Sequence, residues 1–197
     1  MESPTSTFAL IEKVKAGDDQ ALSLAFERCR RRLAVLIYFK LGPRARQLAE
    51  VDDLVQETLL RAFKSIGRFS YQSPGSLLRW LSSIADHVII DQVRYHDRER
   101  RAGSEVRFRS PSNPHGPEPA DTKTPSRLLA QQEAMENLLA RLNGLPEDYR
   151  QAIVMAKIEG LSTAEMAERL GKTRDAVALL VYRAVKRFRT LSLPAAP

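Results

Sequence analysis

The sequence has very little cysteine and no long apolar run, and each shortage excludes a class of protein. A single cysteine, Cys29, stands in 197 residues, which excludes an internal disulfide framework and favours a reducing compartment. No apolar run approaches the ~20 residues that span a bilayer. The first residues, MESPTSTF, also lack the cationic and apolar regions of a signal peptide. We therefore expect a cytoplasmic protein without membrane insertion.

Patterns typical of catalysis and of cofactor binding are missing as well. The three histidines are scattered along the chain, and no nucleophile is paired with a base in a known motif. There is no glycine-rich phosphate loop and no metal-ligand spacing. His87 stands apart from any cluster of metal-binding residue types, so we expect no metal there. The sequence predicts a protein that is not an enzyme and uses neither cofactor nor metal.

Basic residues, by contrast, are plentiful. Lysine and arginine number 31 against 24 aspartates and glutamates, which gives a formal net charge of +7. This balance favours a polyanionic partner, although charge alone does not separate DNA from RNA or from an anionic membrane surface. The apolar content of 43% is sufficient for packed cores in one large or two small domains.

The most informative stretch is residues 161–189, LSTAEMAERLGKTRDAVALLVYRAVKRFR. Ser162 and Glu165 have the spacing of a capping box, and Gly171 supplies a left-handed residue that ends a helix. Thr173 can cap a second helix, in which apolar residues repeat every three to four positions. The pattern predicts a helix-turn-helix whose second helix enters a DNA groove. The alternative is a helical hairpin with a solvated basic face.

The candidate DNA contacts lie on the face of this second helix that is opposite its apolar stripe. The first turns would reach base edges, and the later cations would meet phosphates. The residues are Arg174, Asp175, Ala178, Leu179, Tyr182, Arg183, Lys186 and Arg187.

Helical periodicity also runs through the rest of the chain, and no strand pattern of any length is present. Helices are predicted within residues 8–41, with a break at residues 17–19, and then from about residue 50 and from Ser76. Prolines accumulate between residues 103 and 125, which predicts a flexible linker. The sequence thus predicts an all-α protein with two small helical domains, residues 1–102 and 126–197, joined by a Pro-rich linker at 103–125.

Residues 68–76, RFSYQSPGS, are expected to form a loop that holds a cation and two aromatic rings. Phe69 and Tyr71 could stack on unpaired bases while Arg68 meets a phosphate, and such stacking is worth ~1–3 kcal/mol per base. Equally, both rings could fold back on the core. The sequence leaves these alternatives open. Ser76 is expected to cap the helix that follows.

Three motifs carry a resemblance to a known family. They are VDDLVQETLLRAF at residues 51–63, LLRWLSSIADHVIIDQVR at residues 77–94, and the stretch from Leu145 to Arg189. Through them the chain resembles, nearly from end to end, the extracytoplasmic-function sigma factors of bacterial RNA polymerase. The resemblance implies a sigma-2-like bundle, then a sigma-4-like helix-turn-helix domain. It also implies a function, which is to direct core polymerase to specific promoters and to initiate transcription.

The resemblance further implies roles for particular residues. Residues 161–189 would read the minus-thirty-five element, and the loop at 68–76 would capture a base flipped from the melted minus-ten element. The linker would thread the polymerase cleft. The implied minus-ten contacts are Arg68, Phe69, Tyr71, His87, Asp91, Arg94 and Arg98, and the implied core-polymerase contacts are Asp52, Asp53, Gln56 and Glu57.

The partners implied are core RNA polymerase, through its clamp coiled coil and its flap, and promoter DNA. An anti-sigma factor is a further candidate. The chain departs from the family pattern at Ala178, Leu179 and Leu180, where Lys, Ser or Arg is frequent, and at Asp86-His87, where Arg-Asn is common. Its target promoters therefore do not follow from the resemblance. The alternative functions are a stand-alone helix-turn-helix transcriptional regulator and a helical interaction protein.

Overall fold

The computed structural model of the protein describes residues 6–42, 45–73, 75–101 and 125–191. Within these ranges every regular element is a helix and no strand occurs, which confirms the predicted all-α class. The chain divides into two compact units, residues 1–119 (unit 1) and 120–197 (unit 2). The predicted linker at residues 103–125 lies outside the described residues, except for Pro125, where a helix begins.

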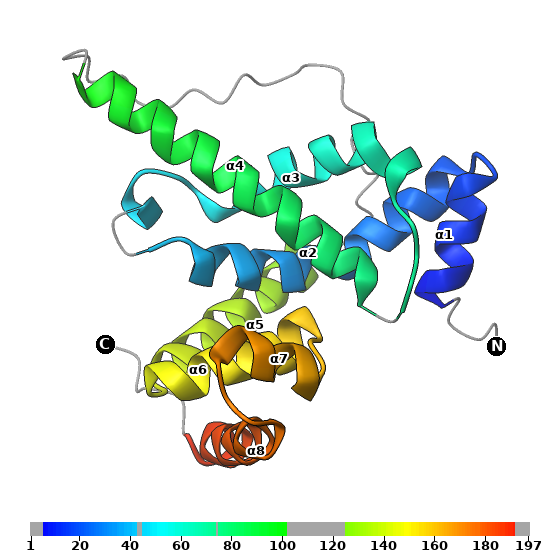
Figure 1. Ribbon diagram of the computed structural model, residues 1–197. Coiled ribbons are helices and arrows are strands. Elements are labelled where there is room, and N and C mark those ends of the chain that lie inside the picture. Colours follow the sequence, from blue (N-terminus) through cyan, green and yellow to red (C-terminus); the bar gives the residue numbers. More distant parts are fainter. Residues whose placement is uncertain (1–5, 43–44, 74, 102–124, 192–197) are drawn as a thin grey trace. The chain divides into compact units, whose positions relative to one another are not determined.

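Unit 1 has four α-helices and two short 3-10 turns among its described residues (Figure 1). They are α1 (Thr7–Lys15), α2 (Asp19–Lys40), η1 (Ala45–Gln47), α3 (Val51–Ser65), η2 (Ile66–Arg68) and α4 (Ser76–Arg101). Helix α2 packs against α1, α3 and α4, and α3 packs against α4. The three longer helices therefore form a bundle, and α1 covers one side of α2.

The corner between α1 and α2 lies where the sequence predicts a break. Gly17 has a φ of 90°, a backbone conformation that favours glycine. Asp18 then caps α2, because its Oδ1 accepts a hydrogen bond from the Ala21 amide at 3.0 Å. The hydroxyl of Ser6 caps α1 by accepting from the Ala9 amide at 3.2 Å. The chain thus reverses within a few residues, and α1 can pack back on α2.

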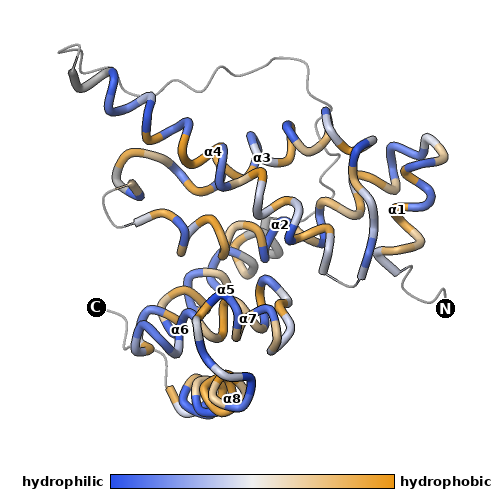
Figure 2. The backbone as a smooth tube through the Cα atoms, viewed as in Figure 1, coloured by the Kyte–Doolittle hydropathy of each residue, from blue (hydrophilic) through white to orange (hydrophobic). Residues whose placement is uncertain are grey.

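The core of unit 1 is built around α2, whose Leu33, Leu36 and Ile37 are completely buried. The other helices add the buried residues Leu10 and Ile11 from α1, Leu54, Val55 and Ala62 from α3, and Leu77, Leu78, Leu81 and Ala85 from α4. In Figure 2 hydrophobic and hydrophilic stretches alternate along α4, as expected for a helix with one buried face.

Two apolar residues that follow the helical spacing of the core residues, and would be expected in the core on that ground, are exposed. Phe63 of α3 exposes 50% of its surface and Val93 of α4 exposes 37%. The buried positions of α3 cover a narrower arc than its apolar residues do, which leaves Phe63 outside that arc. Val93 lies in the second half of α4, where it lines a small hollow with Leu41, Ala45 and Leu48 and is only partly covered. The last turns of α4 extend beyond the other helices of unit 1 (Figure 1). Apolar periodicity therefore overstated how much of each helix is covered.

Every regular element among the described residues of unit 2 is a helix or a helical turn. They are α5 (Pro125–Asn143), α6 (Glu147–Ile153), the π-helical turn η3 (Val154–Glu159), α7 (Thr163–Leu170) and α8 (Arg174–Thr190). Helix α8 packs against α6 and α7, and η3 contacts both of these helices. Pro146 is the N-cap of α6, one residue before the first helical position, which proline also favours. The π-helical turn was not predicted.

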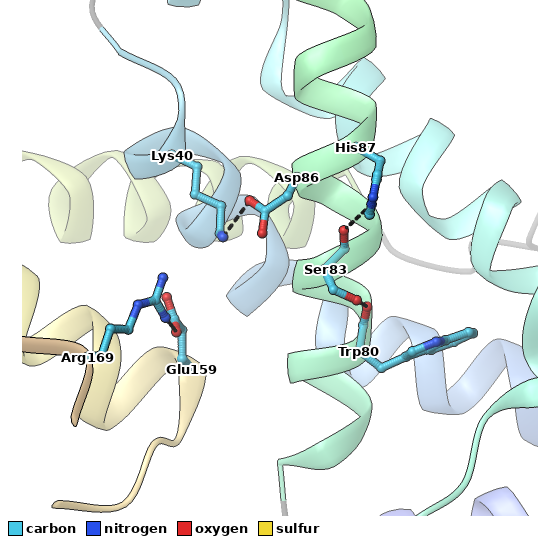
Figure 3. Close-up of polar contacts among 7 residues, drawn as sticks. All are labelled: Lys40, Trp80, Ser83, Asp86, His87, Glu159 and Arg169. Carbon is cyan, nitrogen blue, oxygen red and sulfur yellow. Dashed lines mark hydrogen bonds and ion pairs between the residues drawn. The ribbon is translucent and has the colours of Figure 1, made fainter. Parts of the chain in front are cut away.

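Two arginines tie the elements of unit 2 together. Arg141 of α5 donates from Nη2 to the Phe188 carbonyl oxygen of α8 at 2.7 Å, and its guanidinium lies 4.2 Å from the centre of the Phe188 ring. Arg169 of α7 donates from Nη1 to Oε2 of Glu159 at 2.9 Å (Figure 3). Glu159 is buried at the end of η3, so this pair compensates the burial of a carboxylate.

Replacing Gly171 with alanine tests the turn between α7 and α8. Gly171 has a φ of 62°, and a Cβ there would meet no atom within 4 Å, so the cost comes from the backbone alone. We expect the free energy of unfolding to fall by about 1 kcal/mol, the usual cost of an alanine in the left-handed conformation. Faster amide hydrogen exchange in α7 and α8, followed by mass spectrometry, would report it.

Gly144→Ala is the matched control, because Gly144 lies in the same unit, its φ is not positive, and the nearest atom to an added Cβ is at 3.5 Å. This variant should exchange like the parent chain. Equal exchange in both variants would contradict the assignment of strain to Gly171.

Candidate nucleic-acid interface

The start of the helix-turn-helix is held by the predicted capping box. The Ser162 hydroxyl accepts a hydrogen bond from the Glu165 amide at 3.2 Å, and Glu165 Oε2 accepts one from the Ser162 amide at 2.7 Å. Gly171 then ends α7, and the hydroxyl of Thr173 caps α8 by accepting from the Ala176 amide at 3.2 Å. The three predicted local signals are confirmed, and together they fix where α8 begins.

Helix α8 is buried on one side only. Val177 and Ala184 are its buried residues, and the rest of the predicted apolar stripe is half-buried. All the predicted DNA contacts on its other face are exposed, from Arg174, Asp175, Ala178 and Leu179 to Tyr182, Arg183, Lys186 and Arg187. Tyr182 exposes 65% of its surface. The outer face therefore offers a charged first turn, an apolar middle and a cationic second half.

Helix α3 carries the predicted polymerase contacts. Asp52 and Gln56 are exposed, whereas Asp53 and Glu57 are half-buried. Both aspartates lie in the first turn, where carboxylates complement the positive end of the helix dipole. Further along the helix Leu60 and Phe63 are exposed, at helical spacing from Gln56. Phe63 is not among the contacts predicted from the sequence, because an apolar residue at helical spacing is expected to be buried.

Arg61 is a second residue that the sequence did not single out. Its Nε donates to Glu57 Oε1 at 2.7 Å, and its Nη1 donates to Asp91 Oδ2 of α4, also at 2.7 Å. The hydrogen bond from Arg61 lowers the pKa of Asp91, and the two acceptors raise the pKa of Arg61. Asp91 is therefore ionised throughout the neutral range. One guanidinium thus joins a predicted polymerase contact, Glu57, to a predicted DNA contact, Asp91.

The structure separates the two aromatic rings of the loop at residues 68–76. Phe69 exposes only 7% of its surface, and its ring centre lies 5.0 Å from that of Trp80. The Phe69 ring therefore folds on the core, which is one of the two alternatives that the sequence left open, and its direct contact with a base stays a prediction. Tyr71 is half-buried, and its ring forms an edge-to-face pair with Phe8 of α1, with ring centres 5.3 Å apart. Arg68 is exposed.

Side chains of α4 anchor this loop. Arg79 donates from Nη2 to the Ser73 hydroxyl at 2.7 Å. Ser76 is the first residue of α4, and its hydroxyl accepts a hydrogen bond from the Gln72 amide at 3.4 Å. The prediction that Ser76 caps the helix is therefore wrong. Ser76 is already the first helical residue, and its hydroxyl accepts from the preceding loop and not from the helix. Both contacts restrict the loop beside Tyr71.

The outer face of α4 exposes the remaining predicted minus-ten contacts, which are His87, Asp91, Arg94 and Arg98. The Nδ1 of His87 lies 2.8 Å from the Ser83 carbonyl oxygen (Figure 3). Because a carbonyl oxygen only accepts, Nδ1 carries the proton and Nε2 of the neutral ring is an acceptor. Asp86 accepts from Lys40 Nζ of α2 at 2.6 Å, so a cation accompanies this carboxylate as well.

Other kinds of site are not found in the part of the chain that the structure describes. No group of three or more His, Cys, Asp or Glu side chains is placed to hold a metal ion there. None of the described helices combines the length and the apolar character needed to cross a membrane. Cys29 is buried in α2, and burial raises the pKa of its thiol, which makes it a poor nucleophile.

Solved structures similar to this chain include a sigma factor. The structure of CnrH in complex with the cytosolic domain of CnrY is 20% identical with a TM-score of 0.44, and the match covers 94% of this chain and 96% of that one. The sigma factor RpoE of Bartonella quintana, solved with the anti-sigma factor NepR, is 25% identical with a TM-score of 0.43, covering 87% and 93%.

Curated relatives carry the same description. The ECF RNA polymerase sigma factor SigE of Mycolicibacterium smegmatis is 27% identical over 188 residues, which are 95% of this chain and 68% of that protein. The ECF RNA polymerase sigma factor BldN of Streptomyces coelicolor is 28% identical over 90% of this chain and 62% of its own length. The ECF RNA polymerase sigma-E factor of Escherichia coli is 24% identical, covering 89% and 88%.

Family matches fall in both units. Residues 25–99 match the family described as Sigma-70 region 2, and residues 135–188 match Sigma-70, region 4. The first match contains α3, the loop and most of α4, and the second contains the helix-turn-helix. Together they take in well over half of the chain. The chain therefore belongs to the sigma-70 family, within its extracytoplasmic-function group of sigma factors.

Proposed function

We propose that this sigma factor makes core RNA polymerase promoter-specific in the cytoplasm and carries out no bond chemistry itself. The observation that carries the proposal is the presence of both sigma-70 regions in one chain. In each region, the helices proposed to bind a target expose charged and polar side chains. Helix α8 would bind the minus-thirty-five element as duplex, and α4 with the loop would bind the melted minus-ten element. Helix α3 would dock on the clamp coiled coil.

On α8, Arg174 and Asp175 occupy the first turn, the part of a recognition helix that reaches base edges. Arginine can donate two hydrogen bonds to a guanine, and Ala178 and Leu179 can contact thymine methyl groups. Arg183 and Lys186, further along the exposed face, would meet phosphates. Apolar contacts discriminate less than bidentate hydrogen bonds do, so DNA shape would supply part of the specificity.

In unit 1, the proposed minus-ten contacts are Arg68, Tyr71, His87, Asp91, Arg94 and Arg98. Flipping a base costs a few kcal/mol of stacking, and an aromatic pocket beside cations offsets that cost. Phe69 would hold the loop in position by packing on Trp80 of α4. His87 would present Nε2 as a hydrogen-bond acceptor to the exposed edge of an unpaired base. Melting would then be selective for the captured base.

The docking surface on α3 would combine Asp52, Asp53, Gln56 and Glu57 with the exposed Leu60 and Phe63. Acidic residues steer association toward a basic partner, and an exposed phenylalanine supplies buried area at the contact. The flap of the polymerase is the proposed partner of unit 2. An anti-sigma factor stays a predicted partner on the sequence resemblance alone.

A stand-alone helix-turn-helix regulator would need only unit 2, and it leaves the region 2 match in unit 1 without a role. The two functions differ in one assay. The purified full chain with core polymerase alone should start RNA synthesis on fragments of its own genome, measured by run-off transcription and mapping of the 5′ ends. Duplex binding without initiation on any fragment would instead support the regulator.

Arg174→Ala should weaken binding of the holoenzyme to the upstream element by ~1–3 kcal/mol, the value of a bidentate contact with a base. Promoters mapped in the run-off assay would be compared with copies in which single upstream base pairs are changed. The variant should lose discrimination at one or two of these positions. Arg189→Ala, at the opposite exposed end of α8, is the matched control and should affect all sequences alike. Unchanged discrimination in the Arg174 variant would remove it from the base-reading set.

Asp53→Arg should weaken binding to core polymerase by about tenfold or more, because like charges would then face each other at the docking surface. Binding would be measured by fluorescence anisotropy of the labelled full chain. Asp19→Arg is the matched control, since Asp19 lies in the first turn of α2 and its reversal costs the same helix-dipole interaction. Normal assembly of the Asp53 variant would argue against docking through α3.

A further inference from the structure

Helix α1 places an exposed aromatic ring beside the loop at residues 68–76. Leu10 and Ile11 face α2 and are buried, whereas Phe8 exposes 51% of its surface. Phe8 is not free in solvent, because its ring pairs with that of Tyr71 at a centre-to-centre distance of 5.3 Å and an interplanar angle of 61°. Figure 1 shows α1 and the segment that leads from η2 to α4 side by side. The loop and α1 therefore share one aromatic surface.

This aromatic surface is held in place from several directions. Phe69 packs on Trp80 beneath the loop, and Arg79 binds the Ser73 hydroxyl at its far end. On the other side, the Ser6 cap and the Gly17 turn fix α1 on α2. Phe8 still exposes half of its surface in this pair, so its side chain is accessible to a further ring.

We propose that Phe8 and Tyr71 together form a stacking site for one unpaired base of single-stranded DNA. The inference rests on the proposed function and deepens it, because it adds a residue that precedes the region 2 match, which begins at residue 25. An unpaired base has a flat face that can stack on an aromatic ring. Two adjoining rings offer too little area for a protein partner, and the exposed guanidinium of Arg68 at the start of the loop supplies a cation for the adjacent phosphate.

The test uses the holoenzyme and a promoter mapped by run-off transcription. Templates would carry a single abasic site at each position of the minus-ten non-template strand, and open complexes would be measured by permanganate reactivity. On the intact promoter Phe8→Ala should reduce open complexes about fivefold or more, in line with the loss of a base-stacking contact. At one position the abasic site and Phe8→Ala should not add, because both remove the same contact. At the other positions the two effects should add.

Conservative variants separate stacking from support of the loop. Phe8→Tyr keeps an aromatic face and should behave like the parent, whereas Phe8→Leu keeps apolar bulk and should behave like Phe8→Ala. Leu24→Ala, which removes an exposed apolar side chain from α2, should leave open complexes unchanged. Additive effects at every position, or a Phe8→Leu variant equal to the parent, would overturn the proposal. If the parent holoenzyme initiates nowhere, the proposed function itself has failed, and that outcome is seen before any variant is compared.

Discussion

Burial of α2 is the constraint on which unit 1 depends. Its residues Leu33, Leu36 and Ile37 are completely covered, and α2 is the helix that packs against all three of the others. Each neighbour presents a different proposed surface on its outer side. Helix α3 carries the docking residues, α4 carries the strand-binding residues, and α1 carries Phe8. The relative positions of these surfaces therefore follow from how three apolar faces fit onto one helix.

Polar contacts on the outside of the bundle refine these positions. Lys40 links α2 to Asp86 of α4, and Arg61 links α3 to Asp91 of α4. Such exposed or half-exposed ion pairs contribute little stability individually. Their effect is on orientation, because each pair favours one rotation of α4 about its own axis relative to the neighbouring helix. Each also places a cation beside a carboxylate on a helix that is proposed to approach phosphates, which reduces the repulsion of DNA.

Local signals in the sequence predicted much of this structure. The helix-turn-helix is defined by residues whose contacts lie within a few positions along the chain, so their roles could be predicted from spacing. They are Ser162, Glu165, Gly171 and Thr173. What depends on tertiary packing could not be read in this way. The burial of Phe69 depends on Trp80, which lies eleven positions further along the chain. The exposure of Phe63 depends on how little of α3 its neighbours cover, and Arg61 selects Asp91 from a different helix.

The π-helical turn between Val154 and Glu159 has a consequence for how this fold can change its DNA target. A π-helical turn closes hydrogen bonds between residues five apart instead of four, so it holds one residue more than an α-helical turn. Each helical residue advances the chain by about 100° around the axis. Deleting one residue before Glu159 would restore regular helix and would rotate the residues that follow, Glu159, α7 and α8 included, relative to α6. A change of length in this segment would thus alter the orientation of α8 relative to α6 without replacing any of the side chains proposed to read bases.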